Sequence, residues 1–180
     1  MNFSFKPKLK SVLELKTYIS EYPGFPAPGI IFRDINPLLR DYYFDTLYFM
    51  KESISEEKWQ DIDFIAGIES RGFILASGLA ALTNKGFVPI RKLGKLPGKV
   101  VSEKYNLEYG RDQLEMSPGK GNVLLVDDVL ATGGTLAAGC SLCEQTNHNI
   151  VDILVLINLT RLNSFSWNNK SPISLINYDY

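Results

Sequence analysis

The side chains best suited to chemistry stand directly after an apolar run in the second half of the chain. Val123–Val126 is a run of four apolar residues, which is typical of a buried parallel strand. Asp127 and Asp128 follow at its carboxyl end, where open α/β sheets bind their ligands. Because unpaired carboxylates are costly to bury, two of them at this position indicate a ligand. Such an acid pair is suited to gripping hydroxyl groups or a hydrated metal ion.

A loop of small residues follows the acid pair and opens into a helical stretch. It consists of Ala131, Thr132, Gly133, Gly134 and Thr135. Glycines let the backbone approach a ligand, N–H groups at a helix start converge on an anion, and threonine hydroxyls add donors without charge. This phosphate loop therefore predicts an anion cradle beside the acid pair. The alternative is an ordinary strand–loop–helix joint, in which the acids cap the turn and the glycines start the helix.

A second segment with the same layout lies earlier in the chain. Glu69, Ser70 and Arg71 follow the apolar run 64–68 and precede a helical pattern, so we expect them at the same edge of the sheet. An arginine beside free N–H groups at a helix start is suited to holding pyrophosphate. The alternative is a helix cap with a local ion pair.

Hydrophobic patterning predicts that strands and helices alternate over most of the chain. The expected strands are 64–68, 87–90, 123–126 and 150–159, and the expected helices are 11–20, 42–57, 72–83 and 135–145. Such alternation indicates an α/β fold with a parallel sheet and right-handed crossovers. Between residues 91 and 104 the sequence is polar and basic with no burial period, which predicts a long functional loop.

Composition excludes several classes of protein. The chain has 180 residues, of which 45% are hydrophobic and 22% charged, as in a soluble single domain. Its net charge of −1 gives no electrostatic footprint for nucleic acid or an acidic membrane surface. Because the sequence has no apolar run of about 18 residues and no secretory leader at its start, we predict a cytoplasmic protein with neither nucleic acid nor membrane as partner.

Cys140 and Cys143 have the C-x-x-C spacing of redox and zinc sites. They fall on one face of the expected helix 135–145 without a second cysteine pair, which favours reduced thiols in the core. His148, the single histidine, stands in a polar segment and is predicted to be a solvated turn residue. A single histidine disfavours both a histidine-ligated metal centre and a serine–histidine catalytic site.

The run 123–135 resembles the 5-phosphoribosyl 1-pyrophosphate (PRPP) motif of the type I phosphoribosyltransferases. This resemblance implies an open, mostly parallel twisted sheet flanked by helices, with a small N-terminal hood and a long flexible active-site loop. It implies a single domain over 1–180: a hood and base-recognition segment at about 1–40, a core at 41–161 with the catalytic loop 92–106, and a C-terminal tail at 162–180. The tail matches nothing with a known role.

Three further segments, 25–35, 91–98 and 107–110, are similar to the adenine-specific members of that family. Their presence implies transfer of the phosphoribosyl group from PRPP to N9 of adenine, giving AMP and pyrophosphate, with Mg²⁺ held mainly through substrate and water. The family also implies a homodimer. A phosphoribosyltransferase for another base and a non-catalytic PRPP-binding regulator are the alternatives.

The resemblance also implies roles for individual residues. Asp127 and Asp128 would hold the ribose hydroxyls, and Ala131–Thr135 the 5-phosphate. Pyrophosphate would be bound by Glu69, Ser70 and Arg71, through a cis peptide between Glu69 and Ser70, with charge from Arg91, Lys92 and Lys95. In similar proteins the arginine that matches Arg91 reaches a neighbouring subunit's site. A solvated basic face is the alternative for these three cations.

The base and the lid are assigned in the same way. The resemblance implies that Phe32 stacks on adenine and that the backbone of Ile31 and Arg33 recognises it. Stacking on an exposed aromatic ring is worth about 1–3 kcal/mol. The alternative is a core Phe32 with Arg33 and Asp34 as a surface ion pair. Glu108 would exchange a proton with the base, and Tyr109 would help close the lid.

Overall fold

The computed structural model describes residues 6–106 and 111–179. The chain divides into two compact units, Met1–Glu52 and Ser53–Tyr180. The segment 107–110, which includes Glu108 and Tyr109, lies outside the described residues. Over the described residues, no helix combines the length and hydrophobicity needed to span a membrane.

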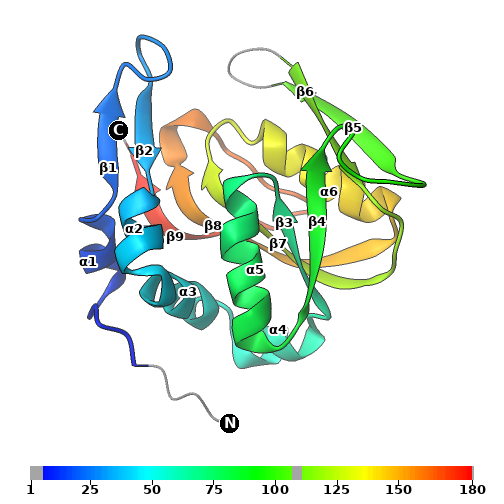
Figure 1. Cartoon of the computed structure of the whole chain (residues 1–180), viewed down its shortest axis with the longest axis horizontal. Coiled ribbons are helices and arrows are strands. Elements are labelled where there is room, and N and C mark those ends of the chain that lie inside the picture. The colour runs from blue at the N-terminus through cyan, green and yellow to red at the C-terminus, as the bar shows by residue number, and fades with distance from the viewer. Residues whose placement is uncertain (1–5, 107–110, 180) are drawn as a thin grey trace. The chain divides into compact units, whose positions relative to one another are not determined.

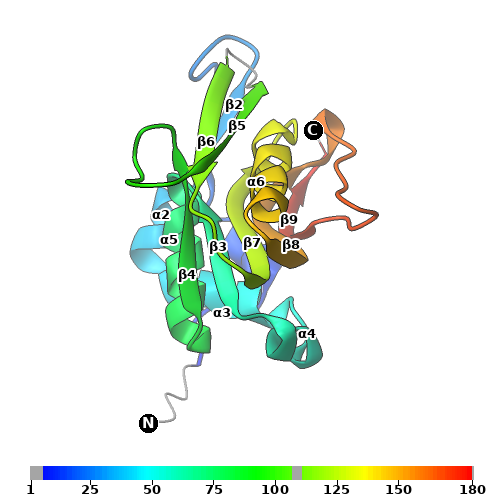
Figure 2. The ribbon, with the colours of Figure 1, turned by 90° about the vertical axis from the view of Figure 1, so that its right-hand side faces the viewer.

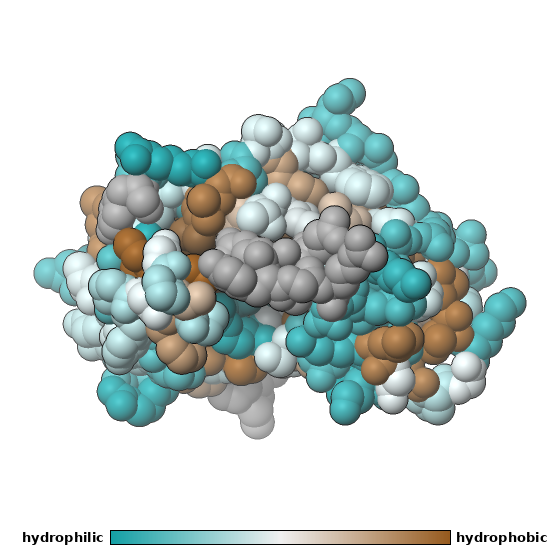
Figure 3. All heavy atoms as spheres, turned by 90° about the horizontal axis from the view of Figure 1, so that it is seen from above, coloured by the Kyte–Doolittle hydropathy of each residue, from teal (hydrophilic) through white to brown (hydrophobic). Residues whose placement is uncertain are grey.

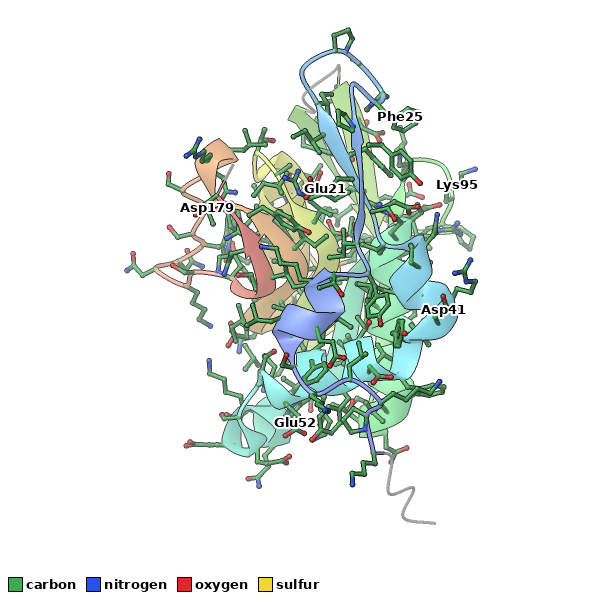
Figure 4. The ribbon with its side chains drawn as sticks, turned by 90° about the vertical axis from the view of Figure 1, so that its left-hand side faces the viewer. Glu21, Phe25, Asp41, Glu52, Lys95 and Asp179 are labelled. Carbon is green, nitrogen blue, oxygen red and sulfur yellow. The ribbon has the colours of Figure 1, made fainter. Side chains whose placement is uncertain are left out.

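The first unit consists of short helices and one hairpin. In chain order its elements are α1 (Val12–Lys16), β1 (Ser20–Pro23), β2 (Ile31–Asp34), α2 (Asn36–Asp41) and α3 (Tyr43–Glu52). The strands β1 and β2 pair antiparallel, with Tyr22 opposite Phe32. Phe25 stands in the turn between them, and Figure 4 labels it together with Glu21 on β1. Proline and glycine residues make this turn, as the sequence indicates.

The second unit contains a seven-stranded sheet with the order β5-β6-β4-β3-β7-β8-β9 (Figure 1). Its parallel strands are β3 (Phe64–Ile68), β4 (Gly86–Lys92), β7 (Gly121–Leu130), β8 (His148–Leu159) and β9 (Ile173–Tyr178). The strands β5 (Val101–Asn106) and β6 (Arg111–Met116) form an antiparallel hairpin that continues the sheet beside β4. The predicted α/β fold with a mostly parallel sheet is therefore confirmed.

The helices α5 (Arg71–Thr83) and α6 (Gly134–Gln145) cover opposite faces of this sheet (Figure 2). Successive residues of β3 face the two helices in turn. A Cβ on Gly67 would lie 2.6 Å from Ala76 of α5, whereas the side chain of Ile68 meets Gly139 of α6. Each contact is possible only because one of its two residues is a glycine. The two helices therefore approach β3 closely near the carboxyl end of that strand.

One hydrophobic cluster of the second unit lies between α6 and the sheet. Cys140 and Cys143 are fully buried there as free thiols, which confirms the prediction for the C-x-x-C pair. Burial raises the pKa of Cys140 above its ordinary value and that of Cys143 to about 12. Both side chains therefore act as small apolar residues. At the surface, Figure 3 shows mostly hydrophilic residues on the face drawn, with hydrophobic ones in separate small patches.

Two predicted elements differ in extent from the sequence interpretation. The helix expected at 42–57 is two helices, because α3 ends at Glu52 and α4 (Glu56–Asp61) begins after Ser55. The Oγ of Ser55 accepts a hydrogen bond from the Lys58 backbone N–H, a side-chain cap that fixes the start of α4. The helix expected at 11–20 is shorter, since α1 ends at Lys16.

The structure differs from the predictions for the loop 92–106 and for His148, and it shows secondary structure in the tail. Residues 101–106 of the expected loop form the strand β5. The tail beyond residue 162 contains β9, an edge strand of the sheet. His148 is wrongly predicted as a solvated turn residue: it begins β8 and is 6% exposed, with Nδ1 2.9 Å from Thr146 Oγ1. Burial lowers the pKa of this histidine.

Candidate active site

The second unit contains a cavity of about 460 Å³ at the carboxyl ends of β3 and β7. This volume is within the usual range for small-molecule sites. Four segments line the cavity: 69–71 between β3 and α5, Lys92 at the end of β4, Tyr105 and Asp112 on the β5–β6 hairpin, and 127–136 around the end of β7. The structure thus brings the acid pair, the phosphate loop and the 69–71 segment together.

The acid pair lies within strand β7, near its carboxyl end, rather than after it. β7 continues to Leu130, and Asp127 and Asp128 are 6% and 7% exposed. The Oδ1 atom of Asp127 accepts a hydrogen bond of 2.9 Å from the Asp128 backbone N–H. On its other side Gly72 of α5 packs so closely that a Cβ there would lie 2.7 Å from Asp127 Oδ1. The carboxylate of Asp127 is therefore held in place from two elements.

An arginine lies against the second acid of the pair. The Nη2 atom of Arg71 is 2.6 Å from Asp128 Oδ2, which is a charge-assisted contact. Burial, together with the neighbouring charge of Asp128, raises the pKa of Asp127 well above its ordinary value. Burial also raises the pKa of Asp128, while Arg71 opposes this shift. Burial makes the ionised form of the pair unfavourable. Positive charge near the two carboxyl groups therefore stabilises that ionised form.

The phosphate loop ends in a helix start without a side-chain cap. Gly133 occupies the N-cap position of α6 with φ +91°, a left-handed conformation that favours glycine. The first turn of α6 has no acidic residue, so its positive end is not offset locally. Backbone N–H groups at this end of a helix are a general anion-binding arrangement.

The segment 69–71 does not form the side-chain helix cap that was the alternative interpretation of its sequence. The Glu69–Ser70 peptide is cis, as the resemblance implies. Ser70 makes no side-chain cap to α5. The Glu69 carboxylate instead accepts a hydrogen bond of 2.9 Å from the Lys92 backbone N–H and contacts Arg91 at 3.3 Å. The backbone donor and Arg91 together hold the pKa of Glu69 below its ordinary value, although partial burial opposes them.

The three predicted cations occupy different positions. The Nζ atom of Lys92 lies 3.1 Å from Asp112 Oδ2 at the cavity wall. Arg91 bonds to Glu69 and donates to the Lys95 carbonyl at 3.2 Å. Lys95, labelled in Figure 4, stands in the turn after β4. Within the described part of the second unit, Arg91 and Lys95 do not line the cavity.

Sequence reasoning missed two lining residues and one supporting residue on the β5–β6 hairpin. The Tyr105 hydroxyl is 3.3 Å from Asp112 Oδ2, and burial with the nearby Asp112 charge raises the pKa of Tyr105 to about 12. Glu115 is 2% exposed and accepts hydrogen bonds from the backbone N–H groups of residues 94–96. Val101, Glu103 and Tyr105 are less exposed than Ser102 and Lys104, which lie between them, but the glutamate on the inner face obscures this two-residue period in the sequence.

The residues predicted for base recognition lie on β2 of the first unit. Phe32 is half-buried, and its ring packs edge-on against that of Phe25 with centroids 5.3 Å apart. Arg33 is 6% exposed and donates to the Ile31 carbonyl at 3.1 Å. The Nε atom of Arg33 lies 3.8 Å from Glu21 Oε1. The Arg33 side chain is therefore buried, whereas the alternative interpretation placed it in a surface ion pair with Asp34.

Comparison with known proteins identifies the class of this protein. A model of the phosphoribosyl transferase domain matches residues 46–166. The chain is thus a member of the phosphoribosyltransferases.

Relatives narrow the class further. The chain is 47% identical over 167 residues to the adenine phosphoribosyltransferase of Bdellovibrio bacteriovorus, covering 92% of this chain and 100% of that protein. Its structure matches the crystal structure of adenine phosphoribosyltransferase from Thermoanaerobacter pseudethanolicus with a TM-score of 0.86 at 37% identity, covering 93% and 100% of the two chains. The Saccharomyces cerevisiae enzyme, complexed with an imino-altritol bisphosphate and adenine, gives a TM-score of 0.84 at 38% identity, covering 91% and 97%. The chain belongs to the adenine phosphoribosyltransferase family.

Proposed function

We propose that this chain transfers the 5-phosphoribosyl group of PRPP to N9 of adenine. The bond between ribose C1 and the pyrophosphate oxygen breaks, the bond between C1 and N9 forms, and N9 loses its proton, giving AMP and pyrophosphate. The observation that carries the proposal is one cavity lined by the acid pair, Arg71 and the phosphate loop, in a chain of this family. The bisphosphate and adenine bound by the Saccharomyces cerevisiae enzyme support the same pair of substrates here.

The acid pair would act on the ribose. Its carboxylates can accept hydrogen bonds from both ribose hydroxyls, and their negative charge favours the oxocarbenium-like transition state in which the ring becomes positive. Burial strengthens this effect, because charges interact more strongly where water is excluded. Because burial raises the pKa of Asp127, this role requires positive charge from Arg71 or from the substrate to keep the side chain ionised.

The anionic parts of PRPP would be bound on two sides of the ribose. Ala131–Thr135 would bind the 5-phosphate through backbone N–H groups and threonine hydroxyls at the start of α6. Glu69, Ser70 and Arg71 would form the pyrophosphate side, where the guanidinium of Arg71 offsets the charge of the leaving group. Lys92 adds positive charge at the cavity wall. For Arg91 and Lys95 we retain a supporting electrostatic role.

Adenine recognition is assigned to the first unit and to the segment outside the described residues. Phe32 would stack on the base, while the backbone of Ile31 and Arg33 would hydrogen-bond to its edge. Glu108 would accept the N9 proton or exchange one with the imidazole part of the base. Tyr109 would help to close the loop 92–106, which would exclude water as a competing nucleophile.

Mg²⁺ fits the oxygen donors of the site. The described residues contain no group of three or more His, Cys, Asp or Glu placed to hold a metal ion. The ion would be held mainly through substrate oxygens and water, an arrangement that this hard cation favours, with the carboxylates of Asp127 and Asp128 adding negative charge. When bound with PRPP, the ion would offset negative charge on the departing pyrophosphate.

We also propose a homodimer and a cytoplasmic location. Both proposals rest on the family resemblance. Light scattering of the purified chain tests the first: a fully active monomer would remove any cross-subunit role for Arg91. Cell fractionation tests the second.

A direct assay tests the activity and its base preference together. Purified chain is incubated with PRPP and Mg²⁺, and separately with adenine, hypoxanthine, guanine and orotate, while pyrophosphate release is followed. We expect release with adenine at least about a hundredfold faster than with the other bases, because unmatched buried polar groups penalise the wrong base. Faster turnover of another base would refute the adenine assignment, and binding of PRPP without turnover would indicate the regulator.

Variants of the acid pair test the ribose assignment. We expect D127N and D128N each to lower kcat/KM for PRPP by about a hundredfold or more, as typical losses of transition-state charge stabilisation do. The matched control is D61N, because Asp61 is an exposed aspartate at the end of α4, and we expect its kinetics to be unchanged. Near-normal kinetics in D127N and D128N would count against the assignment.

A further inference from the structure

The segment that follows β8 reaches back to the phosphate loop. After η1 (Thr160–Leu162), the chain runs alongside α6 toward β9 (Figure 2). Asn163 and Phe165, which we call the brace, contact the loop near the start of α6. Farther along, the Nε1 atom of Trp167 donates to Glu144 near the end of the same helix at 2.8 Å. The segment is therefore attached at both ends of α6.

The Asn163 amide joins the loop to the end of β8. Its Nδ2 atom donates to the Ala131 carbonyl at 2.8 Å, and the same nitrogen lies 3.0 Å from the Leu159 carbonyl and 3.1 Å from Asn158 Oδ1. Its Oδ1 atom accepts a hydrogen bond of 3.2 Å from the Phe165 backbone N–H. Both ends of the amide are engaged, so its orientation is fixed.

This contact determines the direction of one backbone donor of the phosphate loop. In a trans peptide the C=O and the following N–H point in opposite directions. Because the Ala131 carbonyl points to Asn163, the N–H of Thr132 points away from the brace. Thr132 is one of the residues that line the cavity. Asn163 therefore selects the peptide orientation that offers this N–H to an anion.

Phe165 restrains the next part of the loop. A Cβ placed on Gly133 would lie 2.8 Å from Cδ2 of the Phe165 ring. Gly133 has φ +91°, and the ring packs directly over it. Phe165 also packs against the core formed by the sheet and α6, which limits the movement of the ring. The ring thereby holds the glycine in its left-handed conformation.

We propose that the brace is a positioning device for binding of the 5-phosphate, with Asn163 orienting the Ala131–Thr132 peptide and Phe165 holding Gly133. This inference rests on the proposed role of the phosphate loop. It assigns a role in substrate binding to part of the tail, for which the sequence indicated none. Neither side chain acts on the reacting atoms, so the effect is on affinity for one end of PRPP.

The test compares ligands that occupy different ends of PRPP. Affinities for ribose 5-phosphate and for inorganic pyrophosphate are measured by calorimetry for the full chain, with KM for PRPP and adenine alongside. For N163A we expect ribose 5-phosphate affinity and KM for PRPP to worsen by about fivefold to tenfold, the effect of one lost buried hydrogen bond. Pyrophosphate affinity, KM for adenine and kcat should stay within about twofold.

Three further variants sharpen the test. N163D keeps the shape but removes the donor, so its selective loss should equal or exceed that of N163A. N163S keeps a donor on a shorter side chain and replaces N163A if that variant does not fold. The matched control is N168G: Asn168 donates to Glu144 from the same segment at φ +48°, and glycine preserves that backbone while removing the amide. All measured affinities should be unchanged in N168G.

The outcomes separate the two proposals. Selective loss of ribose 5-phosphate affinity supports the brace. Unchanged affinity, or an equal loss for all ligands together with a lower Tm, overturns the brace and leaves the proposed function standing. If the unaltered chain binds neither PRPP nor ribose 5-phosphate, the proposed function itself fails.

Discussion

Glu115 holds the turn after β4 by an arrangement that makes a quantitative prediction. Its carboxylate accepts backbone hydrogen bonds of 3.0, 2.7 and 2.6 Å from Gly94, Lys95 and Leu96. The side chain is almost completely buried, and it extends from β6 toward the turn that follows Lys92. We predict that E115Q destabilises the second unit through this turn.

The magnitude follows from the two carboxylate oxygens. Oε1 accepts from Lys95 and Leu96, and Oε2 accepts from Gly94. A glutamine can keep one oxygen toward two donors, but its NH₂ group then faces the Gly94 N–H. One charge-assisted hydrogen bond is lost and the others become neutral. At about 1.5–3 kcal/mol for a hydrogen bond to a charged group, we expect the free energy of unfolding to fall by about 2–3 kcal/mol.

The pH dependence of this difference has a definite sign. Burial disfavours the charged form of Glu115, but the three backbone donors outweigh it and hold the pKa below its ordinary value. A carboxyl group whose pKa is lowered on folding stabilises the protein above its unfolded pKa of about 4.3 and loses that contribution as the pH falls through the folded value. The difference between the unaltered chain and E115Q should therefore be full at pH 7 and shrink below about pH 4.

Urea unfolding of both chains from pH 7 downward measures this difference. E103Q is the matched control, because Glu103 on the neighbouring strand accepts only neutral side-chain hydrogen bonds from Ser141 and Gln145 in the described structure. We expect E103Q to change the free energy of unfolding by less than about 1 kcal/mol. A change below about 0.5 kcal/mol in E115Q at pH 7, or one that does not vary with pH, would refute the reasoning.

Three other predictions concern close contacts and base stacking. G133A forces a left-handed alanine against Phe165, so KM for PRPP should rise by about tenfold. In an F165A background the rise should be smaller, because only the backbone penalty remains. Equal rises in the two backgrounds would show that the Phe165 ring does not contribute. G72A would displace the Asp127 carboxylate, and steady-state kinetics should show kcat/KM lower by about tenfold to a hundredfold; an unchanged value would mean that this contact yields freely. F32A should raise KM for adenine by about tenfold without changing KM for PRPP, whereas a rise in both would argue against stacking.

Much of the second unit follows from its sequence. Strand β3 and the helices α5 and α6 agree with their predicted ranges to within a residue, because apolar runs and amphipathic periods are strong where both faces of a parallel sheet are covered. The acid pair, the phosphate loop and the 69–71 segment could be expected near one another, since strand order alone sends parallel carboxyl ends to one edge. The cavity that they line is consistent with that expectation.

The remainder depends on contacts between distant segments, which a local pattern does not encode. His148 has polar neighbours in sequence, yet it packs over Gly119 and beside Thr146, and neither contact could be inferred from composition. The β5–β6 hairpin was missed because its inner face includes Glu103, whose partners lie on α6. The role that we propose for Asn163 likewise arises from a segment more than thirty residues away, with which it shares a hydrogen bond.

The start of α6 at Gly134, where no side chain caps the helix, has a consequence for anyone who handles this protein. Phosphate or sulfate ions in a buffer can occupy such an amide end and favour the native state by mass action. At a concentration a hundred times the dissociation constant this amounts to about 2.7 kcal/mol. Melting curves recorded in phosphate buffer would then describe an anion-loaded protein, and buffers without phosphate or sulfate would be needed to measure its intrinsic thermal stability.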